Sequence, residues 1–590
     1  MLLSNILKNN SISWSNFWFC YLFFFYFSGF YQLFLFLSEQ SGFYGFRQTI
    51  YMSLLWLIPL IIFPRQTKLL TALIGTVLWG TSLVLIGYYA VYGQNFSQSV
   101  LFIIFESNFS EGSEYLESYF SWWIIFGFLI YSLLAFFLWK KIKPVNTTPG
   151  MRVILVVTLS FIISWPAFNS LVLHHSSINK ALHSQMNHME PAAPWHLVFG
   201  FIKYKEQLHK IEQNLIANKN LPPLDGFINN NSDTSNTMVL VIGESTNRQR
   251  MGLYGYSRNT TPKLEAMKDD LLIFDNVYAP RPYTIETLEQ VLTFADEKNP
   301  DLYLTKPTLM NIMKQAGYKT YWITNQQTQT KRNTMLTTFS KQADKQIYLN
   351  NDKNQNSAQY DGVVLKPFKR ILDKKEVKNK FIVVHLLGTH RKYSYRYPED
   401  MAYFKGSENV PTWLNESQTK EYNAYDNAVR YNDYVLSSLI KILKGSSDNS
   451  LLVHFSDHGE EVYDNPQHLF AGRNEAAPTA PMYTIPFIIW QSDSWKKKTQ
   501  IEQNKNDIIH RSYSTSDFIY TWSDLADITF NEFDASRSMV NPAFSKHPIW
   551  IGDPNNPKKL RDLQKNPFSK KHNSLYVDQD YVSKKLNQIN

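Results

Sequence analysis

Cysteine is nearly absent from this chain of 590 residues, which contains only Cys20. A single cysteine excludes an intrachain disulfide, so cysteine usage says nothing about the redox compartment. Charge is also scarce, at 18% of residues against about 25% in an ordinary soluble protein. Residues 1–179 hold eight Lys/Arg and five Asp/Glu, which leaves 51 basic and 45 acidic residues for 180–590. This split excludes a single soluble domain, a disordered chain and a pure transporter, and it predicts a membrane anchor followed by a large soluble domain.

Long apolar runs fill the charge-poor third of the chain. A helix needs about 20 apolar residues to cross the hydrocarbon layer. Five runs stand out: Trp14–Leu37, Thr49–Pro64, Leu69–Tyr92, Trp122–Trp139 and Val153–Val172. The second run is short and contains Pro59. No small-residue cleavage site follows the first run, so we interpret it as a helix rather than a signal peptide. We therefore predict a transmembrane anchor of about five helices over residues 1–173.

The charges of the loops predict the orientation of this anchor. Basic residues precede the first run and lie in the loops after the second and fourth runs. The loop after the third run contains four glutamates and no basic residue, and only Arg47, after the first run, departs from the pattern. We therefore expect an internal N-terminus, five crossings and a chain that lies outside the cytoplasm beyond Val172.

Residues 174–236 are predicted to connect the anchor to the soluble domain, which would occupy residues 237–590. Trp195–Leu215 has the pattern of an amphipathic helix, which would lie on the bilayer surface or pack on the soluble domain. Asn229–Asn236 is polar and rich in turn residues, which is typical of a linker. The soluble part is mildly basic, which suits an anionic surface or substrate, although a plain solvated face is the simpler interpretation.

From Met238 onward, short apolar runs rich in β-branched residues alternate with helical segments. The predicted strands are Met238–Ile242, Thr320–Thr324, Phe381–Leu386, Leu451–Phe455 and Phe487–Trp490, and the predicted helices include Thr308–Ala316 and Tyr425–Leu443. This order predicts an α/β domain with a mainly parallel sheet sandwiched by helices. In such sheets the ligand site lies beyond the carboxyl ends of the strands. No nucleotide-binding glycine fingerprint is visible.

Candidate metal ligands follow three of the predicted strands. Glu244 follows the first, His390 trails the third, and Asp457 and His458 follow the fourth. Carboxylate oxygens combined with imidazole nitrogens suit zinc better than manganese or magnesium. Gly459 would let the backbone turn tightly enough for Asp457 and His458 to bind one ion. Each residue taken alone is more often structural, since most of the 14 histidines must be inert.

Thr284 lies where a loop enters the predicted helix Ile285–Phe294. Threonine is a favoured N-cap residue, and local sequence alone favours that structural role. The functional interpretation is a nucleophile at a helix N-terminus, where free amides favour a phosphate. A coordinated zinc ion could lower the pKa of the hydroxyl and supply the alkoxide.

Several motifs resemble the bacterial phosphoethanolamine transferases, a family of the alkaline phosphatase and sulfatase superfamily. They are Val239–Arg248 with Gly255–Pro262, Arg281–Asp296, His385–His390, Tyr397–Pro398, Asp457–Glu461 and Trp550–Gly552, and with the five-helix anchor they cover nearly the whole chain. Arg281–Glu286 and Leu304–Pro307 are most similar to the group that modifies the lipopolysaccharide core. Relatives that modify lipid A carry several disulfides in the soluble domain, and this chain can form none.

This resemblance implies one Zn²⁺ held by Glu244, Thr284, Asp457 and His458, with Thr284 as the catalytic nucleophile that carries phosphoethanolamine. His390 and His468 would form a second pair of histidines that contacts the phosphate or a second metal. The implied donor is phosphatidylethanolamine, and the implied acceptor is a phosphate of lipopolysaccharide, either core heptose phosphate or, as the alternative, lipid A. The protein would lie among the lipids of the bacterial inner membrane with its catalytic domain in the periplasm. No nucleic-acid partner is expected.

Other classes of protein are less consistent with these residues. A membrane phosphatase of the same fold remains an alternative, whereas a sulfatase requires a cysteine or serine that becomes formylglycine, and Thr284 cannot be converted. A transferase that builds glycerophosphate polymers would differ in its donor. A non-catalytic sensor or scaffold would not need the intact set of Glu, Thr, Asp and His.

Overall fold

The computed structural model describes residues 12–38, 43–92, 122–218, 223–231, 235–326, 334–350, 360–466, 470–475, 477–499, 501–552, 554 and 560–568. The chain forms two compact units, Met1–Gln207 and Leu208–Asn590. The four glutamates of the third loop and His468 lie outside the described residues.

Among the described residues of the first unit, five helical segments are long and apolar enough to cross a membrane, as predicted. They are α2 (Trp14–Leu37), α3 to α4 (Phe43–Met52, Leu57–Ile62, joined by the 3₁₀ turn Ser53–Trp56), α5 (Thr67–Tyr92, after the 3₁₀ turn Pro64–Gln66), α8 (Trp122–Lys141) and α9 (Pro149–Phe168, continued by a π turn, Asn169–Leu173). The second segment begins at Phe43 and is therefore longer than its apolar run. Pro59 is tolerated because it is the third residue of α4, where a backbone N–H has no partner within the helix.

Aromatic side chains build the core of the first unit around α2. Phe24 and Phe27 are fully buried, and the Tyr26 ring stacks on the Tyr131 ring of α8 with 4.7 Å between centroids. The Tyr131 hydroxyl donates a hydrogen bond of 2.9 Å to Ser82 Oγ on α5. Bulky apolar side chains of α8 point outward, which is the pattern of a helix that faces lipid.

Two further helices, α10 (Ile178–Met189) and α11 (Trp195–Asn218), follow the five apolar segments. The predicted amphipathic helix is α11, and its first turn is packed within the first unit. The Trp195 ring stacks on the Trp56 ring at 6.0 Å, and just before it the Ala193 amide donates a hydrogen bond of 2.9 Å to Ser28 Oγ. These contacts fix the start of α11 against α2 and the turn before α4.

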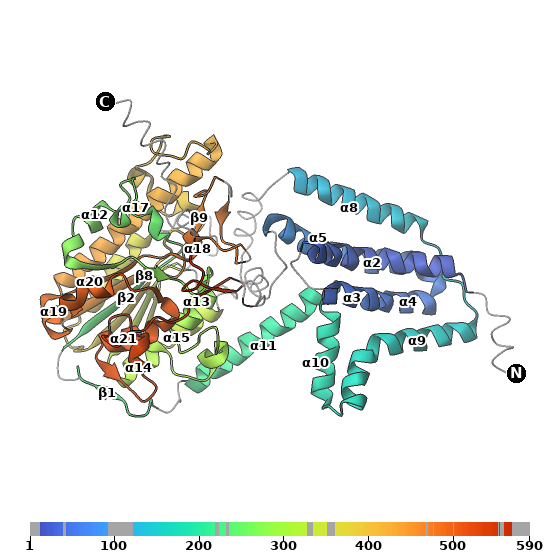
Figure 1. Ribbon diagram of the computed structural model, residues 1–590, viewed down its shortest axis with the longest axis horizontal. Helices are drawn as coiled ribbons and strands as arrows, with labels where there is room; N and C mark the ends of the chain where they lie inside the picture. Colours follow the sequence, from blue (N-terminus) through green and yellow to red (C-terminus); the bar gives the residue numbers. More distant parts are fainter. Residues whose placement is uncertain are drawn as a thin grey trace. The chain divides into compact units, whose positions relative to one another are not determined.

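The second unit contains a seven-stranded sheet, as the alternating pattern predicted (Figure 1). Its strand order is β3 (Leu271–Phe274), β11 (Phe487–Gln491), β8 (Ser450–Ser456), β2 (Thr237–Gly243), β7 (Lys380–His385), β5 (Lys319–Thr324) and β6 (Lys345–Tyr348). The strands from β8 to β6 are mutually parallel, and β11 is antiparallel to both of its neighbours. Every residue of β2, β7, β8 and β11 is buried, as expected for strands covered on both faces.

Alternate residues of each central strand contact different helical layers. Leu240 belongs to a core with α13 (Thr284–Val291), α14 (Leu309–Gln315) and α21 (Phe518–Leu525), whereas Val241 belongs to a core on the opposite face. Helices α16 (Leu365–Leu372) and α17 (Glu416–Lys444) cover that opposite face. Smaller elements complete the unit: α12 (Pro262–Glu265), α15 (Thr334–Lys341), α18 (Ala480–Tyr483), α19 (Asp493–Thr499), α20 (Lys505–Ile508), and the strand pairs β4 (Val277–Tyr278) with β12 (Tyr513–Ser514), β9 (Glu461–Val462) with β10 (Ala471–Gly472), and β14 (Trp550–Ile551) with β15 (Arg561–Asp562).

Part of the predicted linker is built into the second unit. Strand β1 (Ile228–Asn229) pairs antiparallel with β13 (Ile528–Thr529). The Asn231 side chain is buried and donates a hydrogen bond of 2.8 Å to the Ala526 carbonyl. The described part of this polar segment is therefore fixed to the soluble unit.

Candidate active site

Strand register brings two of the predicted ligands together. Strands β2 and β8 are parallel neighbours in which Gly243 pairs with Ser456. The next residues along each strand, Glu244 and Asp457, therefore leave the sheet side by side at the carboxyl edge. Both side chains are buried, as is that of His458.

The loop after β7 approaches Glu244 closely and requires a glycine. The Thr389 amide donates a hydrogen bond of 2.9 Å to the Glu244 carbonyl. Gly388 has a φ of +58°, and a Cβ atom there would lie 2.5 Å from the same carbonyl oxygen. Only glycine allows both this backbone conformation and this approach.

Helix α17 holds the turn that follows Glu244. The Tyr425 hydroxyl donates a hydrogen bond of 2.7 Å to the Ser245 carbonyl and accepts one of 2.8 Å from the Asn247 amide. Further along, the buried Arg250 guanidinium forms ion pairs with Asp426 on α17 (2.6 Å) and with Asp464 (2.8 Å). The backbone around Glu244 is thus held by contacts with α17 and with Asp464.

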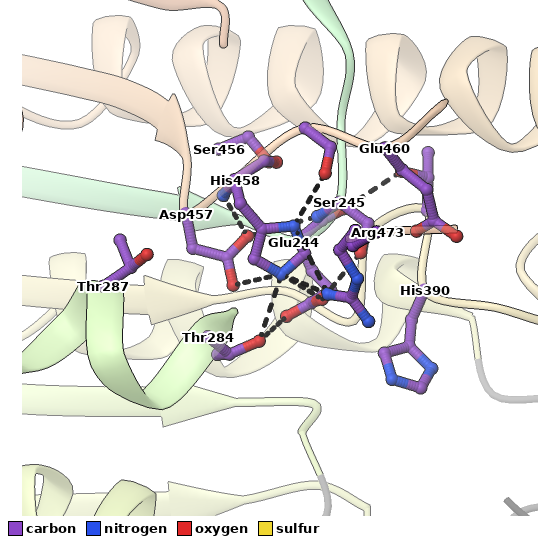
Figure 2. Close-up of polar contacts among 12 residues, drawn as sticks. Glu244, Ser245, Thr284, Thr287, His390, Ser456, Asp457, His458, Glu460 and Arg473 are labelled. Carbon is purple, nitrogen blue, oxygen red and sulfur yellow. Dashed lines mark hydrogen bonds and ion pairs between the residues drawn. The ribbon is translucent and has the colours of Figure 1, made fainter. Parts of the chain in front are cut away.

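Glu244, Asp457 and His458 form the group of potential metal ligands that the described part of the chain contains. One ligand atom from each lies within 4.8 Å of the others. His458 Nε2 lies 3.2 Å from Glu244 Oε1 and 3.5 Å from Asp457 Oδ2. Figure 2 shows the three side chains pointing toward one another, with Thr284 beside them.

Thr284 is the first residue of α13, and its hydroxyl faces the carboxylate group. Thr284 Oγ1 donates a hydrogen bond of 3.0 Å to Glu244 Oε2 and lies 3.3 Å from His458 Nε2. Tyr283 occupies the N-cap position, and no side chain caps the helix. The capping interpretation of Thr284 is therefore wrong, because a cap hydroxyl would accept a hydrogen bond from an amide of its own helix. The helix also ends three residues earlier than predicted, at Val291.

Three features of these side chains fit a zinc ion. Asp457 Oδ2 is buried and accepts no hydrogen bond from any described residue. His458 Nδ1 lies 2.9 Å from the Gly459 carbonyl, which places the proton on Nδ1 and leaves the Nε2 lone pair for a metal. Burial and the adjacent Glu244 carboxylate raise the pKa of Asp457 to about 8, so the site favours a cation between its two carboxylates. Carboxylate oxygen and imidazole nitrogen are both zinc ligands, and three protein ligands with an open fourth position are typical of catalytic zinc.

Gly459 is required for a different reason from the one predicted. Its φ is not positive, so it makes no left-handed turn. A Cβ atom there would lie 2.1 Å from the Pro481 carbonyl oxygen. Gly459 therefore provides space for the backbone before β11 to approach the site.

Several neighbours of the site were not predicted. Arg473 Nη1 lies 2.5 Å from His458 Nε2 and 3.8 Å from Glu244 Oε1, and Gln326 Nε2 donates a hydrogen bond of 3.3 Å to Glu244 Oε2. Ser245 Oγ donates a hydrogen bond of 2.8 Å to Glu244 Oε1. Gln326 follows β5, so the strand-end rule could have found it. Arg473 follows the two-residue strand β10 in an irregular loop that carries no sequence pattern.

The second pair of predicted histidines is only partly described. His390 lies beside the site on the loop after β7, with its ring apart from the three ligand side chains (Figure 2). Burial lowers the pKa of His390 to about 4, so its imidazole is neutral at neutral pH. The Glu460 carboxylate accepts a hydrogen bond of 2.6 Å from the Tyr393 hydroxyl. The prediction for His468 falls outside the described residues.

The fold and the site define a sulfatase-like protein with a membrane anchor. The family model described as Sulfatase matches residues 236–528. The phosphoethanolamine transferase EptC of Escherichia coli K12 is 48% identical over 569 residues, which cover 94% of this chain and 97% of that protein. The phosphoethanolamine transferase CptA of Salmonella typhimurium is 48% identical over 563 residues and covers 95% and 97%. The chain therefore belongs to the phosphoethanolamine transferase family.

Solved structures support the same assignment. The zinc complex of the C-terminal periplasmic domain of Escherichia coli EptC has a TM-score of 0.57 and 52% identity, and the match covers 60% of this chain and 99% of that one. The integral membrane lipooligosaccharide phosphoethanolamine transferase A of Neisseria meningitidis has a TM-score of 0.60 and 19% identity, with coverage of 88% and 97%. The latter similarity concerns the fold, including the helical anchor.

Proposed function

We propose that this protein transfers phosphoethanolamine from phosphatidylethanolamine to a phosphate on the lipopolysaccharide core, through a phosphoethanolamine-threonine intermediate. The observation that carries the proposal is the position of Thr284. Its hydroxyl lies at the start of a helix, within 3.0 Å of Glu244 Oε2 and 3.3 Å of His458 Nε2. A nucleophilic hydroxyl, a proton acceptor and a potential metal ligand thus meet at one point.

Glu244, Asp457, His458 and Thr284 are the residues that would hold Zn²⁺. When bound there, the ion would lower the pKa of the threonine hydroxyl and offset negative charge on the phosphoryl oxygens. The zinc complex of the Escherichia coli EptC domain supports this choice of metal. The chain itself contributes the geometry, since Thr389, Ser245 and Gln326 fix both the backbone and the carboxylate of Glu244.

The first half of the reaction forms a bond between Thr284 Oγ1 and the donor phosphorus. The bond from phosphorus to the glycerol oxygen breaks, and diacylglycerol leaves after its oxygen gains a proton. The hydrogen bond to Glu244 Oε2 directs the threonine proton toward that carboxylate. The N-terminus of α13 favours the phosphate, because a helix N-terminus binds anions.

The second half of the reaction regenerates the threonine. An oxygen of the acceptor phosphate attacks the phosphorus, the bond to Thr284 Oγ1 breaks, and the hydroxyl regains a proton. Arg473 points toward the same site and supplies a positive charge that would stabilise the phosphoryl oxygens in both steps. His390 is neutral in the substrate-free site, and the negative charge of a bound phosphate would raise its pKa.

The five apolar segments support a position in the inner membrane, with residues beyond the anchor in the periplasm. There the donor lipid is presented at the outer surface of the same membrane. The absence of cysteine from the soluble unit and the similarity to CptA and EptC support the core, rather than lipid A, as the acceptor.

Mass spectrometry of the purified full-length protein would test the intermediate. We expect a fraction of the molecules to carry phosphoethanolamine on the peptide that contains Thr284, and acceptor lipopolysaccharide should remove it. A modification at another residue would refute the mechanism. A strain that lacks the protein should lose phosphoethanolamine from core heptose phosphate and keep its lipid A pattern, whereas loss confined to lipid A would overturn the choice of acceptor alone.

A further inference from the structure

A cavity of about 300 Å³ lies next to the helix that Thr284 begins. Pro280, which precedes Thr284, and Gln290, on α13, line it together with residues of the turn after α13, of the 3₁₀ turn Thr515–Asp517 and of the segment that leads to β14. Gln290 lies six residues beyond Thr284, or roughly 9 Å along the helix. The proposed zinc ligands do not line the cavity, so it is distinct from the catalytic site.

The walls of the cavity are polar but not suited to a phosphate. Arg537 donates hydrogen bonds to Asp517 (2.7 Å) and to Asp296 (3.1 Å). The lining contains four carboxylates against one arginine and one lysine. Because the net charge of the lining is negative, an anionic group would be repelled.

A simple cation is also a poor match for these walls. Arg537 already forms hydrogen bonds with two of the four carboxylates. Glu297 accepts a hydrogen bond of 3.0 Å from the Gln290 amide, and Asp534 accepts hydrogen bonds of 3.0 Å and 2.7 Å from the amide and hydroxyl of Ser536. The cavity is therefore lined by polar groups that are already hydrogen-bonded to one another and that can also form hydrogen bonds with the hydroxyls of a ligand.

Gln290 is the second observation that indicates a ligand. Its side chain lines the cavity and is 94% buried, yet its Oε1 atom has no hydrogen-bond partner among the described residues. A buried polar atom without a partner is costly, and a hydroxyl donor in the cavity would satisfy it. Trp550, half-buried at the cavity, adds an aromatic surface. An indole beside hydrogen-bond donors and acceptors matches a sugar ring, which has an apolar C–H face and a rim of hydroxyls.

We propose that this cavity is a subsite for an uncharged sugar of the acceptor. The inference rests on the proposed function, in which the acceptor is lipopolysaccharide. Pro280 and Gln290 flank Thr284 along the chain, so a phosphate at Thr284 and a sugar in the cavity can belong to one acceptor molecule. The negative lining excludes the phosphorylated sugar itself, and the cavity therefore binds a neighbouring unit of the oligosaccharide. Recognition of that unit would select among the phosphates of the acceptor.

The test uses the full-length protein in detergent and the variant Ser516→Leu. Ser516 lines the cavity and is partly exposed, so leucine would fill the cavity without removing a core side chain. Ser407→Leu, at an exposed position on another surface, is the matched control. Two rates are measured with phosphatidylethanolamine that carries a fluorophore on its ethanolamine group. The first is the labelling of Thr284 without acceptor, and the second is the transfer of the label to lipopolysaccharide at increasing concentration.

We expect Ser516→Leu to raise the acceptor KM about tenfold or more, the effect of losing one or two hydrogen bonds, while Thr284 labelling stays at the wild-type rate. Gln290→Ala should likewise raise the acceptor KM and leave Thr284 labelling at the wild-type rate. Ser407→Leu should leave both quantities at their wild-type values. Dephosphorylated, deacylated core oligosaccharide should inhibit transfer by the wild-type protein and should bind to it, but not to Ser516→Leu, in calorimetry.

An unchanged acceptor KM in both Ser516→Leu and Gln290→Ala would overturn the subsite. So would equal losses of labelling and transfer in folded variants, because the cavity would then only support α13. If the wild-type protein is never labelled on Thr284, the proposed function fails instead. The calorimetric binding of the oligosaccharide would still decide whether the cavity binds a sugar.

Discussion

The Thr284 hydroxyl donates its hydrogen bond to Glu244 Oε2 at 3.0 Å and leaves the amides of its own helix uncapped. One contact therefore does two things. It directs the hydroxyl oxygen toward the potential metal ligands, and it keeps that hydroxyl from capping the N-terminus of α13. Both are needed if a phosphate is to be attacked at this helix end.

Replacing Thr284 should remove the activity of the protein while changing its stability little. Thr284→Ala should abolish transfer, because no other group can form the phosphoenzyme, yet the free energy of unfolding should fall by only about 1 kcal/mol for one hydrogen bond. Thr284→Ser should retain part of the activity. Transfer from a fluorescent donor lipid and thermal unfolding would be measured together. Thr287→Ala is the matched control, since it loses the buried hydrogen bond from Thr287 Oγ1 to the Arg281 carbonyl and should keep its activity. Normal transfer by Thr284→Ala would refute the mechanism.

Asp457→Asn tests the metal site without disturbing the backbone. Asp457 Oδ1 accepts hydrogen bonds from the amides of Ser245 (3.1 Å) and His458 (2.7 Å), and the asparagine oxygen can accept both. We expect the zinc content of the purified protein, measured by mass spectrometry of the element, to fall at least tenfold. The metal-free variant should melt at or above the temperature of the metal-free wild type, because one of two adjacent carboxylates is gone. Asp433→Asn, away from the site, should keep its zinc, and full zinc occupancy in Asp457→Asn would exclude Asp457 as a ligand.

Arg473 is expected to act on the phosphoryl group rather than on the metal. Arg473→Gln should lower the transfer rate by roughly a hundredfold, the usual effect of losing one charge-stabilising donor. Its zinc content should be unchanged or higher, since the guanidinium lies next to His458 Nε2. Arg473→Lys should recover part of the rate. If Arg473→Gln loses zinc and activity in parallel, the arginine supports the metal site and not the reaction.

The pH dependence of stability should contain a contribution from Asp433. This carboxylate accepts hydrogen bonds from the amides of Lys263 (2.9 Å) and Leu264 (2.8 Å), and burial raises its pKa from 3.8 to about 6. The folded state therefore binds this proton more tightly than the unfolded state. The resulting stabilisation is complete below about pH 4 and is lost as the pH rises through 6.

Urea unfolding of the soluble domain at pH 4, 5, 6 and 7 would show this contribution. The stability of the wild type relative to Asp433→Asn should decline by up to about 2 kcal/mol over that range. Differences that stay constant with pH would show that Asp433 titrates alike in the folded and unfolded states.

The orientation of the anchor can be tested with reporter fusions. An alkaline phosphatase reporter is active only outside the cytoplasm, so a fusion after Asn236 should be active and one after Lys143 inactive. This expectation follows from the basic residues around the fourth loop and the five apolar segments. The opposite pair of results would contradict an anchor with five crossings.

Residues at strand ends were predictable because two simple regularities combine. Buried runs locate the central strands, and parallel strands place their following residues at one edge, so Glu244 and Asp457 could be expected to meet. The edge strands β3 and β6 were missed. Strand β6 is only half-buried and contains Lys345 and Gln346, so it lacks the apolar signal of the centre.

Other features depend on contacts that no local pattern contains. Arg250 lies in a segment that resembles a solvated charged turn, but its guanidinium is fully buried against Asp426 and Asp464, far away in sequence. Likewise, the role of the Thr284 hydroxyl depends on Glu244, and local sequence favoured a cap. The start of α17 was missed because its first turns are polar, although Asn415 and Gln418 form a capping box there.

The hydrogen bonds between Tyr425 and the turn after Glu244 affect how the protein would bind the proposed metal ion. Two hydrogen bonds with Tyr425 of α17 hold this turn, so its conformation would not depend on a metal in the way that the fold of a zinc finger does. Folding and metal loading are then separate events. If the site holds zinc, the ion could therefore bind after the chain has folded. On the proposed zinc mechanism, a chelator would consequently give an inactive but folded protein, and added zinc would restore its activity without a refolding lag.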